Sequence, residues 1–477
     1  MTQAKTAQSE TPKSGRSWLD RYFFVSERGS TYGRELRGGL TTFMAMAYII
    51  VLNPLILGGV EDINGDTLNI AQLTTMTVLS AGFVTILMGV IGRAPLALAA
   101  ALGVMAVVAY QAAPQMTWPE AMGLVIWQGV AIILMVVTGV RTAVMNALPA
   151  NLRIAIGVGI GMFVALIGLE NATFVSGSES TLLELGTDGQ LTGWPVLVFV
   201  VGLLISAILL VRAVPGAIFY GIITATVLAV IVHQVFAVPD EAWGDQVPEL
   251  PGQLMSTPDF GLFGQIDLFG AWTSAGVASA GIILFTLVLA GFFDALGTIL
   301  AVGEKAGLTN ERGQMPRVNE ILTVDGAGAI SGGITSSSAT LVFVESTAGV
   351  SEGARTGLAS VVTGGLFLLA MLFTPVTGIV PSQAAACALV LVGAMMMMHI
   401  GRIDWSDITV AIPAFLTIAM MPFAYSIAHG IGAGIIAHTV LKTAQGKFGE
   451  VGWLMWILTT VFVGYFGIAG VERLLGV

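Results

Sequence analysis

The stretch that decides the fold begins with VLAGFFDALGTILAVG (288–303) and ends with SGGITSSSATLVFVESTAG (331–349). The first segment carries one carboxylate, Asp294, in an otherwise uncharged helical run, and the second carries Glu345 just after a Ser/Thr cluster. Removing an ionisable side chain from water costs several kcal/mol unless the group has a partner or a function. Two interpretations stay open at this point. Each carboxylate is capped by backbone or hydroxyl groups as a structural feature, or the pair binds a polar solute and carries a proton.

The composition of the chain identifies its class. Of its 477 residues, 55% are hydrophobic and 10% are charged, and the mean hydropathy is +0.88. Soluble domains carry about a quarter charged residues, so we predict an all-α polytopic membrane protein. The net charge of −10 does not indicate nucleic-acid binding, because the acids are gathered in particular loops. The single cysteine, Cys387, excludes an intramolecular disulfide.

Apolar runs of the length that spans a bilayer, roughly 17–25 residues, follow one another along the chain. They lie at about 38–60, 72–92, 119–140, 148–168, 193–213, 216–237, 272–302, 318–334, 354–379, 383–400, 408–425, 428–443 and 451–474. With two broken segments, 95–113 and 335–350, these runs predict about 14 membrane elements and a further terminal helix. The run 408–443 is either one kinked element or two short ones.

The charges predict the orientation of the chain. If the N-terminus is cytosolic, the loops 61–71, 169–192 and 238–270 lie outside, and they contain acids but no Lys or Arg. The basic residues then gather on the cytosolic side, as the positive-inside rule requires. We expect a multi-pass protein of the cell (plasma or inner) membrane. Its cytosolic tail, 1–36, contains a short surface helix near Trp18–Phe24.

The two broken segments predict where a site lies. Each is the third element of its half, is short and is rich in small residues, and such pairs are typical of inverted-repeat transporters with a site at mid-membrane. A strand followed by a half-helix leaves backbone N–H groups and a positive dipole end inside the membrane, where they can hold a polar ligand. The alternative is a Gly-rich kink in a packed helix.

Four stretches resemble a known family. The sequence is similar to the nucleobase–cation symporter-2 family, in its azaguanine-type hypoxanthine/guanine/adenine permease branch. The matching stretches are RGGLTTFMAMAYIIVLNP (37–54), FFDALGTILAVGEKAGL (292–308), FVESTAGVSEGARTGL (343–358) and IPAFLTIAMMPFAYSIAHGIGAGII (412–436). The resemblance implies a seven-plus-seven (7+7) inverted repeat, a core domain against a gate domain, a homodimer, and proton-coupled uptake of a nucleobase.

The resemblance also divides the chain. The expected parts are a tail (1–36), the first half of the core (37–142, elements 1–4), the first half of the gate (143–237, elements 5–7), an extracellular or periplasmic loop (238–271), the second half of the core (272–380, elements 8–11) and the second half of the gate (381–477, elements 12–14 and the terminal helix).

The resemblance implies roles for particular residues. Asp294 corresponds to the acid that contacts the base, and Thr298 lies on the same helical face. Glu345 corresponds to the acid at the start of the tenth element's half-helix, with Phe343 at the family's aromatic position. We expect both carboxylates to face one cavity that Phe343 and Met105 line, with Gly103 beside it.

Several positions depart from the family's pattern. Asparagine is replaced by Met105 in the third element, an acid by Gly291 in the eighth, threonines by Leu341 and Val342, and an acid of the twelfth-to-thirteenth region by His429. A less polar pocket satisfies fewer ligand heteroatoms, and unmatched polar groups are costly to desolvate. The substrate within the class therefore stays open.

The sequence gives little support to metal binding or to enzymatic catalysis. The four histidines are not spaced as metal ligands, and no Cys or carboxylate joins them. The sequence shows no nucleophile–base pair of the kind that an enzyme uses. No cofactor is expected other than the proton as coupling ion.

Three functions remain under consideration. The first is a proton-coupled symporter that imports a nucleobase, foremost a purine such as hypoxanthine, guanine or adenine. The second is a transporter of the same fold for another small heterocycle or an organic or inorganic anion, and the third is a receptor or channel that does not cycle. Two carboxylates in a dry cavity cannot both be ionised cheaply. We favour Asp294 as the proton carrier, because the N-terminus of a half-helix can hold Glu345 ionised.

Overall fold

A computed structural model describes residues 17–139, 148–178, 181–187, 189–244, 246–309 and 315–475. Within this part of the chain, nine helices are long and apolar enough to cross a membrane. The predicted all-α polytopic class is therefore confirmed. The first sixteen residues of the predicted tail and the predicted boundary at 142/143 lie outside the described residues.

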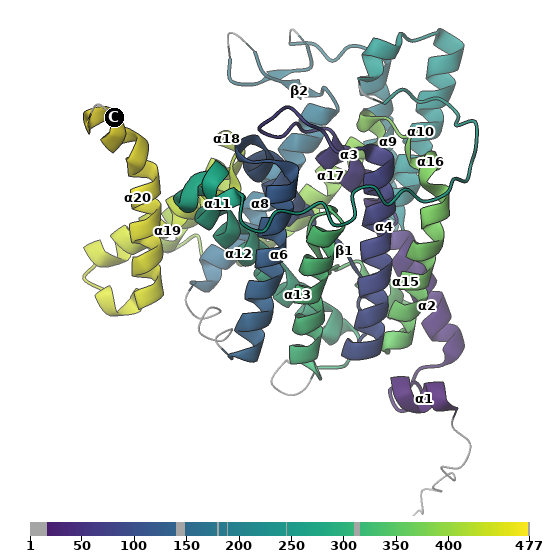
Figure 1. Ribbon diagram of the computed structural model, residues 1–477, viewed down its shortest axis with the longest axis horizontal. Coiled ribbons are helices and arrows are strands. Elements are labelled where there is room, and N and C mark those ends of the chain that lie inside the picture. The colour runs from purple at the N-terminus through teal and green to yellow at the C-terminus, as the bar shows by residue number, and fades with distance from the viewer. Residues whose placement is uncertain are drawn as a thin grey trace, which may run out of the picture.

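The helices of the first half of the chain form the purple-to-teal part of Figure 1. They are α1 (Trp18–Phe23), α2 (Tyr32–Met46), α3 (Ile49–Gly58), α4 (Ile70–Leu87), α5 (Leu102–Val107), α6 (Trp118–Val137), α8 (Ala150–Asn171), α9 (Trp194–Val211) and α10 (Ala217–Phe236). A π-helical turn, Met88–Gly92, extends α4, and another, Val108–Ala112, extends α5.

The second half repeats the same kinds of element. Its helices are α11 (Ala271–Ser274), α12 (Gly276–Lys305), α13 (Val318–Ile334), α14 (Ser346–Ser351), α15 (Gly357–Ala370), α16 (Thr374–Thr377), α17 (Ser382–Met397), α18 (Ile408–Phe423), α19 (Ile427–Ala444) and α20 (Trp453–Leu475). The helix α20 contacts α19 and stands apart from the rest of the bundle (Figure 1).

The long helices pack in two groups. Helix α13 packs on α6, and α15 packs on α2 and α4, around the two broken segments. In the second group α17 packs on α8, α9 and α10, and α18 packs on α8 and α19. The residue ranges given above for a core and a gate domain stay predictions.

The two broken segments meet in the middle of the bundle, as predicted. Strand β1 (Leu98–Ala100) pairs antiparallel with strand β4 (Thr340–Val342), and Ala99 lies opposite Leu341. Each strand leads directly into a half-helix, α5 or α14. These half-helices run to opposite ends of the bundle, because Met116 follows the first and contacts the loop at Ile63, whereas Gly353 follows the second and contacts Ser30.

Neighbouring helices satisfy the backbone groups of these strands. An irregular segment at membrane depth is tolerated only where protein covers its polar groups. The Thr85 hydroxyl of α4 donates to the Leu98 carbonyl at 3.0 Å and accepts from the Leu98 N–H at 2.9 Å. On the other strand, Thr340 shares a hydrogen bond of 2.7 Å with Ser80. The Ser80 and Thr85 hydroxyls of α4 therefore hold the two strands in place.

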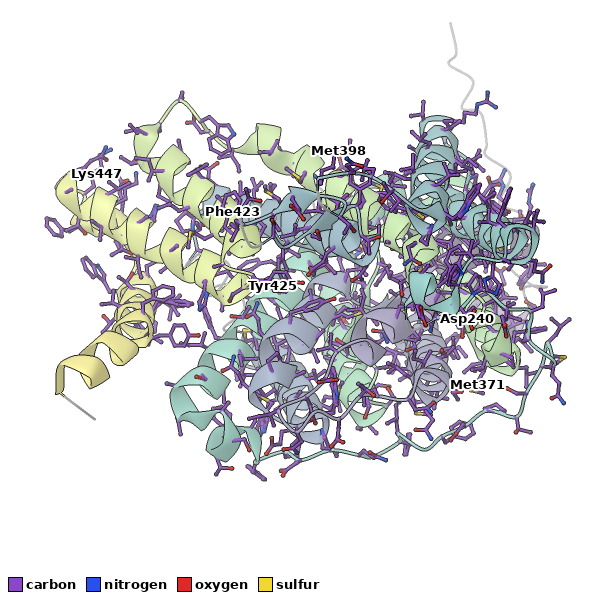
Figure 2. The ribbon with its side chains drawn as sticks, turned by 90° about the horizontal axis from the view of Figure 1, so that it is seen from above. Asp240, Met371, Met398, Phe423, Tyr425 and Lys447 are labelled. Atoms are coloured by element: carbon purple, nitrogen blue, oxygen red, sulfur yellow. The ribbon has the colours of Figure 1, made fainter. Side chains whose placement is uncertain are left out.

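Two of the predicted runs divide into separate helices. The run 38–60 is broken at Ala47–Tyr48, between α2 and α3. The run 408–443, which the sequence left open, forms two helices joined at residues 424–426, where Tyr425 has a φ of 49°. Helix α19 leads from Tyr425, beside the rest of the bundle, outward to Lys447 (Figure 2). A further strand pair, Val175–Ser176 with Glu184–Leu185, has no counterpart in the predicted elements.

The acidic loops share one end of the molecule, which we call the acidic-loop face and define by residues 59–69, 172–193 and 237–270. The Trp118 N–H donates to the Asp62 carboxylate at 3.1 Å, and Gln72 donates to Asp259 at 3.1 Å. Helix α1 lies at the opposite end (Figure 1). There the fully buried Glu35 accepts a hydrogen bond of 2.9 Å from the Arg355 N–H. Local hydrogen bonds thus order both ends.

Candidate functional site

Asp294 lies in the interior of the bundle, but its side chain is not covered by other protein atoms. It occupies the second half of the 30-residue helix α12, and its side chain is exposed, whereas Thr298, one turn later, is buried. Asp294 is within electrostatic range of Glu345 and of the fully buried Tyr48. We infer from these neighbours that its open surface faces a gap inside the protein rather than lipid.

Glu345 is held by a side chain that the sequence analysis did not identify. It occupies the N-cap position of α14, and its Oε1 accepts a hydrogen bond of 2.8 Å from the Tyr48 hydroxyl. Tyr48 sits at the break between α2 and α3, inside the first of the four family-like stretches. A hydrogen bond from a neutral donor favours the ionised form of a carboxylate. Tyr48 therefore supplies a reason for Glu345 to stay ionised that is independent of the half-helix.

A third carboxylate, Asp325, was also missed. It is fully buried on α13, and its Oδ1 accepts a hydrogen bond of 2.9 Å from the Val342 N–H of strand β4. Its buried Oδ2 has no hydrogen-bond partner in the part of the chain that the structure describes, and Asp294 lies within electrostatic range. The criterion that singled out Asp294, a carboxylate inside an apolar run, applies equally to Asp325 in the run 318–334.

Gln128 fills the space that the absence of a side chain at Gly291 leaves. A Cβ at Gly291 would lie 2.3 Å from the Gln128 Nε2 and 3.0 Å from the Leu341 Cδ1. Gln128 is fully buried on α6, and neither of its amide atoms has a hydrogen-bond partner within the described residues. The acid that the family resemblance places at position 291 is thus replaced by a neutral amide that reaches in from another helix.

The remaining predicted residues surround the carboxylates to different degrees. Phe343 follows strand β4, is 7% exposed and donates its N–H to the Ala97 carbonyl at 2.9 Å. Met105 is fully buried in α5, so its thioether does not border open space, while Gly103 packs toward Ile160 of α8. The role of each residue in binding stays a prediction.

His429 lies away from these carboxylates. Its side chain packs against Tyr465 of α20, with ring centroids 5.9 Å apart, and its N–H donates to the N-cap residue Ser426 at 3.3 Å. No group of three or more His, Cys, Asp and Glu side chains that could hold a metal ion occurs in the part of the chain that the structure describes.

The site is acidic and lacks a paired cation. Asp294, Asp325 and Glu345 come from three different elements, and no described Lys or Arg forms an ion pair with any of them. Carboxylates inside a protein without a counter-ion favour a bound proton or a neutral ligand that donates hydrogen bonds. This arrangement disfavours a negatively charged ligand.

Tyr48→Phe is expected to weaken ligand binding, because it removes the only side chain that donates a hydrogen bond to Glu345 within the described residues. A hydrogen bond to a charged group contributes about 1.5–3 kcal/mol, and Glu345 is partly exposed, so we expect the lower end of this range. The KM for uptake should rise about tenfold. Tyr220→Phe, on the exposed face of α10, is the matched control. An unchanged KM in Tyr48→Phe would remove Tyr48 from the site.

Comparison with known proteins identifies the family to which the chain belongs. The model of the xanthine/uracil permease family, which is described as "Permease family", matches residues 33–433. The chain is 37% identical to the guanine/hypoxanthine permease PbuG of Bacillus subtilis over 456 residues, which cover 94% of this chain and 99% of PbuG. It is 34% identical to the adenine permease AdeP of Escherichia coli over 458 residues, which cover 96% of this chain and 97% of AdeP.

Solved structures share the fold at low sequence identity. The transmembrane domain of the cyanobacterial bicarbonate transporter BicA aligns with a TM-score of 0.58 and 17% identity, covering 85% of this chain and 97% of that one. The structure of SLC26A9 aligns with a TM-score of 0.61 and 12% identity, covering 90% of this chain and 67% of that one. At these identities the likeness concerns the fold alone.

Proposed function

Because the chain belongs to the xanthine/uracil permease family over most of its length, we propose that it is a secondary transporter that moves a purine nucleobase together with a proton. The named relatives are adenine and guanine/hypoxanthine permeases, and they match this chain along nearly their whole length. Transport of a base by a permease of this kind leaves the substrate chemically unchanged, so no enzymatic step is part of the proposal.

The observation that carries the proposal is the pair Asp294 and Glu345 without a cation. A protonated carboxyl group at Asp294 can donate a hydrogen bond to a ring nitrogen or carbonyl of the base, and an ionised Glu345 can accept one from a ring N–H. Loading then requires a proton on one carboxylate and a base between the two. Release of the proton on the other side of the membrane weakens the hold on the base.

Coupling of this kind must work in both directions. If a proton raises the affinity for the base by a given factor, the base raises the affinity for the proton by the same factor. We assign the proton to Asp294, because the Tyr48 hydroxyl favours the ionised form of Glu345. Asp325 is placed to hold strand β4 through the Val342 N–H, and we assign it a positioning role.

The alternative substrate class is an anion, which the fold alone would allow. Anion sites normally offer Lys, Arg or several free N–H groups. At this site Asp294 lies within electrostatic range of Glu345 and of Asp325, and no described Lys or Arg forms an ion pair with any of the three. We therefore place neutral purines ahead of anions.

The proposal includes an orientation and an assembly. We propose a cytosolic N-terminus in a cell membrane, on the positive-inside argument, and a homodimer, on the family resemblance. Labelling of engineered cysteines from one side of intact cells tests the first. Molecular-mass measurement of the purified protein in detergent tests the second.

A competition experiment separates the substrate classes. Proteoliposomes that contain the protein are given labelled hypoxanthine with an excess of adenine, guanine, uracil, bicarbonate or sulfate. We expect one or more purines to suppress uptake at least tenfold and the two anions to leave it unchanged. Uptake that responds to anions but not to purines would favour the alternative class.

A further inference from the structure

A cavity opens on the acidic-loop face, and neither Asp294 nor Glu345 lines it. We call it the vestibule; its volume is about 630 Å³, and it lies between α3, the loop that follows α3, and α17. Ligand pockets commonly measure about 300–1,000 Å³, so a purine ring fits with room to spare. The polar side chains on its wall are Glu61, Thr67, Asn69, Tyr110, Asn171, Gln246 and Ser382.

Gln246 is the feature that points to a ligand. Its side chain is 7% exposed, it lines the vestibule, and its buried Oε1 has no hydrogen-bond partner among the described residues. A buried acceptor left unsatisfied costs about 1–3 kcal/mol. Such a cost is offset when a hydrogen-bond donor enters the vestibule.

Trp243 is anchored close to Gln246 in the sequence. Trp243, three residues earlier, is fully buried, and its indole N–H donates to His233 Nδ1 at 3.2 Å. The Trp243 carbonyl accepts from the Gln383 side chain of α17 at 3.5 Å. The anchored Trp243 therefore lies three positions before the residue that lines the vestibule.

Tyr110 supplies an aromatic wall. Its ring packs edge-on against Phe163, with centroids 6.2 Å apart, and against Tyr425, with centroids 5.6 Å apart. Tyr425, labelled in Figure 2, donates its hydroxyl to Glu170 at 2.8 Å, which fixes the cluster. Flat heterocycles bind well against such rings, because stacking contributes about 1–3 kcal/mol per base in nucleic-acid sites.

The charge of the vestibule defines the ligand. Its wall contains a carboxylate and three carboxamides, and no Lys or Arg lines it within the described residues. Carboxamides both donate and accept hydrogen bonds, whereas Glu61 disfavours anions. A neutral planar heterocycle with N–H donors fits this wall.

We propose that the vestibule is a second binding site, which takes up the same purine before it reaches Asp294 and Glu345. This inference rests on the proposed function for the identity of its ligand. The vestibule wall and the residue that holds Glu345 are close along the start of α3. Leu52, on the vestibule wall, donates its backbone N–H to the Tyr48 carbonyl at 3.0 Å, so one helical turn separates the vestibule from the residue that holds Glu345.

Equilibrium binding to the detergent-purified full-length protein tests this proposal, with radiolabelled adenine and hypoxanthine as probes. We expect two sites per chain. Gln246→Leu should raise the Kd of one of them about fivefold, the loss of one neutral hydrogen bond, and leave the other unchanged. Ser382→Trp, which fills the vestibule from the start of α17, should abolish the same site. Gln253→Leu, on an exposed part of the same loop, is the control.

The double variant Asp294→Asn with Glu345→Gln separates the two proposals. If both hold, this variant weakens the site that is insensitive to Gln246→Leu and leaves the site that is sensitive to it unchanged. If it keeps that site while the wild type transports no purine, the proposed function fails and the vestibule stands. The vestibule proposal is overturned if the wild type shows no purine binding that Gln246→Leu weakens, or if bicarbonate and sulfate compete at that site as well as adenine does.

Discussion

Asp294→Asn is expected to abolish accumulation of purine driven by a pH gradient, while exchange of labelled for unlabelled purine continues. The amide keeps the shape of the carboxyl group and can still form hydrogen bonds, but it cannot take up or release a proton. With one proton per base, a gradient of one pH unit supplies about 1.4 kcal/mol, which supports about a tenfold accumulation. The variant should show none, as measured in proteoliposomes with an imposed gradient.

Glu345→Gln tests the division of roles between the two carboxylates. The glutamine amide can still accept a hydrogen bond from the Tyr48 hydroxyl, but it carries no negative charge. We therefore expect weaker purine binding, with some purine accumulation remaining. Glu352→Gln, an exposed change just after the same half-helix, should behave as the parent does. If Asp294→Asn and Glu345→Gln both accumulate purine like the parent, neither carboxylate couples the proton.

Gly332→Ala is expected to prevent the protein from reaching its folded state in good yield. A Cβ at this position of α13 would lie 1.8 Å from the Ser338 carbonyl oxygen and 3.0 Å from the Thr340 backbone nitrogen. These are backbone atoms of the segment that enters strand β4, where Ser336 and Ser338 already have positive φ values of 52° and 65°. The segment has little freedom to move, so the substitution should destabilise by about 3 kcal/mol or more.

The measurement is the yield of monodisperse protein and its thermal midpoint in detergent. Gly365→Ala is the control, because it also lies within a helix, α15, and a Cβ there meets no atom within 4 Å. The control should be neutral or slightly stabilising, since alanine favours a helix by about 1 kcal/mol over glycine. Equal yield and equal midpoint for the two variants would mean that α13 does not hold the strand as closely as described.

The architecture was predictable because its signals are local. Pro95, Gly103 and Pro114 interrupt one apolar run, and the Ser/Thr residues before Glu345 interrupt the other, so two short elements could be expected to meet. The break within 38–60 gave no such signal, because the residues around Ala47–Tyr48 are apolar and contain no Pro or Gly. Tertiary contacts decide where that helix divides.

The candidate site was predictable only in part, because its partners lie far apart in the sequence. Tyr48 and Glu345 are separated by 297 positions, and no spacing rule joins them. Gln128 reaches the space beside Gly291 from another helix. The sequence shows glycine at position 291, where the family usually has an acid, but it does not show that the Gln128 amide fills this space. Asp325 could have been identified from its charge alone, yet its contact with strand β4 depends on the folded structure.

Proton movement driven by the base itself tests the central claim most directly. Wild-type proteoliposomes that enclose a pH-sensitive dye receive a purine that the competition experiment identifies as a substrate, with no pH gradient imposed. We expect the interior to acidify as the base enters, and we expect no such change with Asp294→Asn or with empty liposomes. Entry of the base without acidification would contradict the account, because the base would then cross the membrane without a proton.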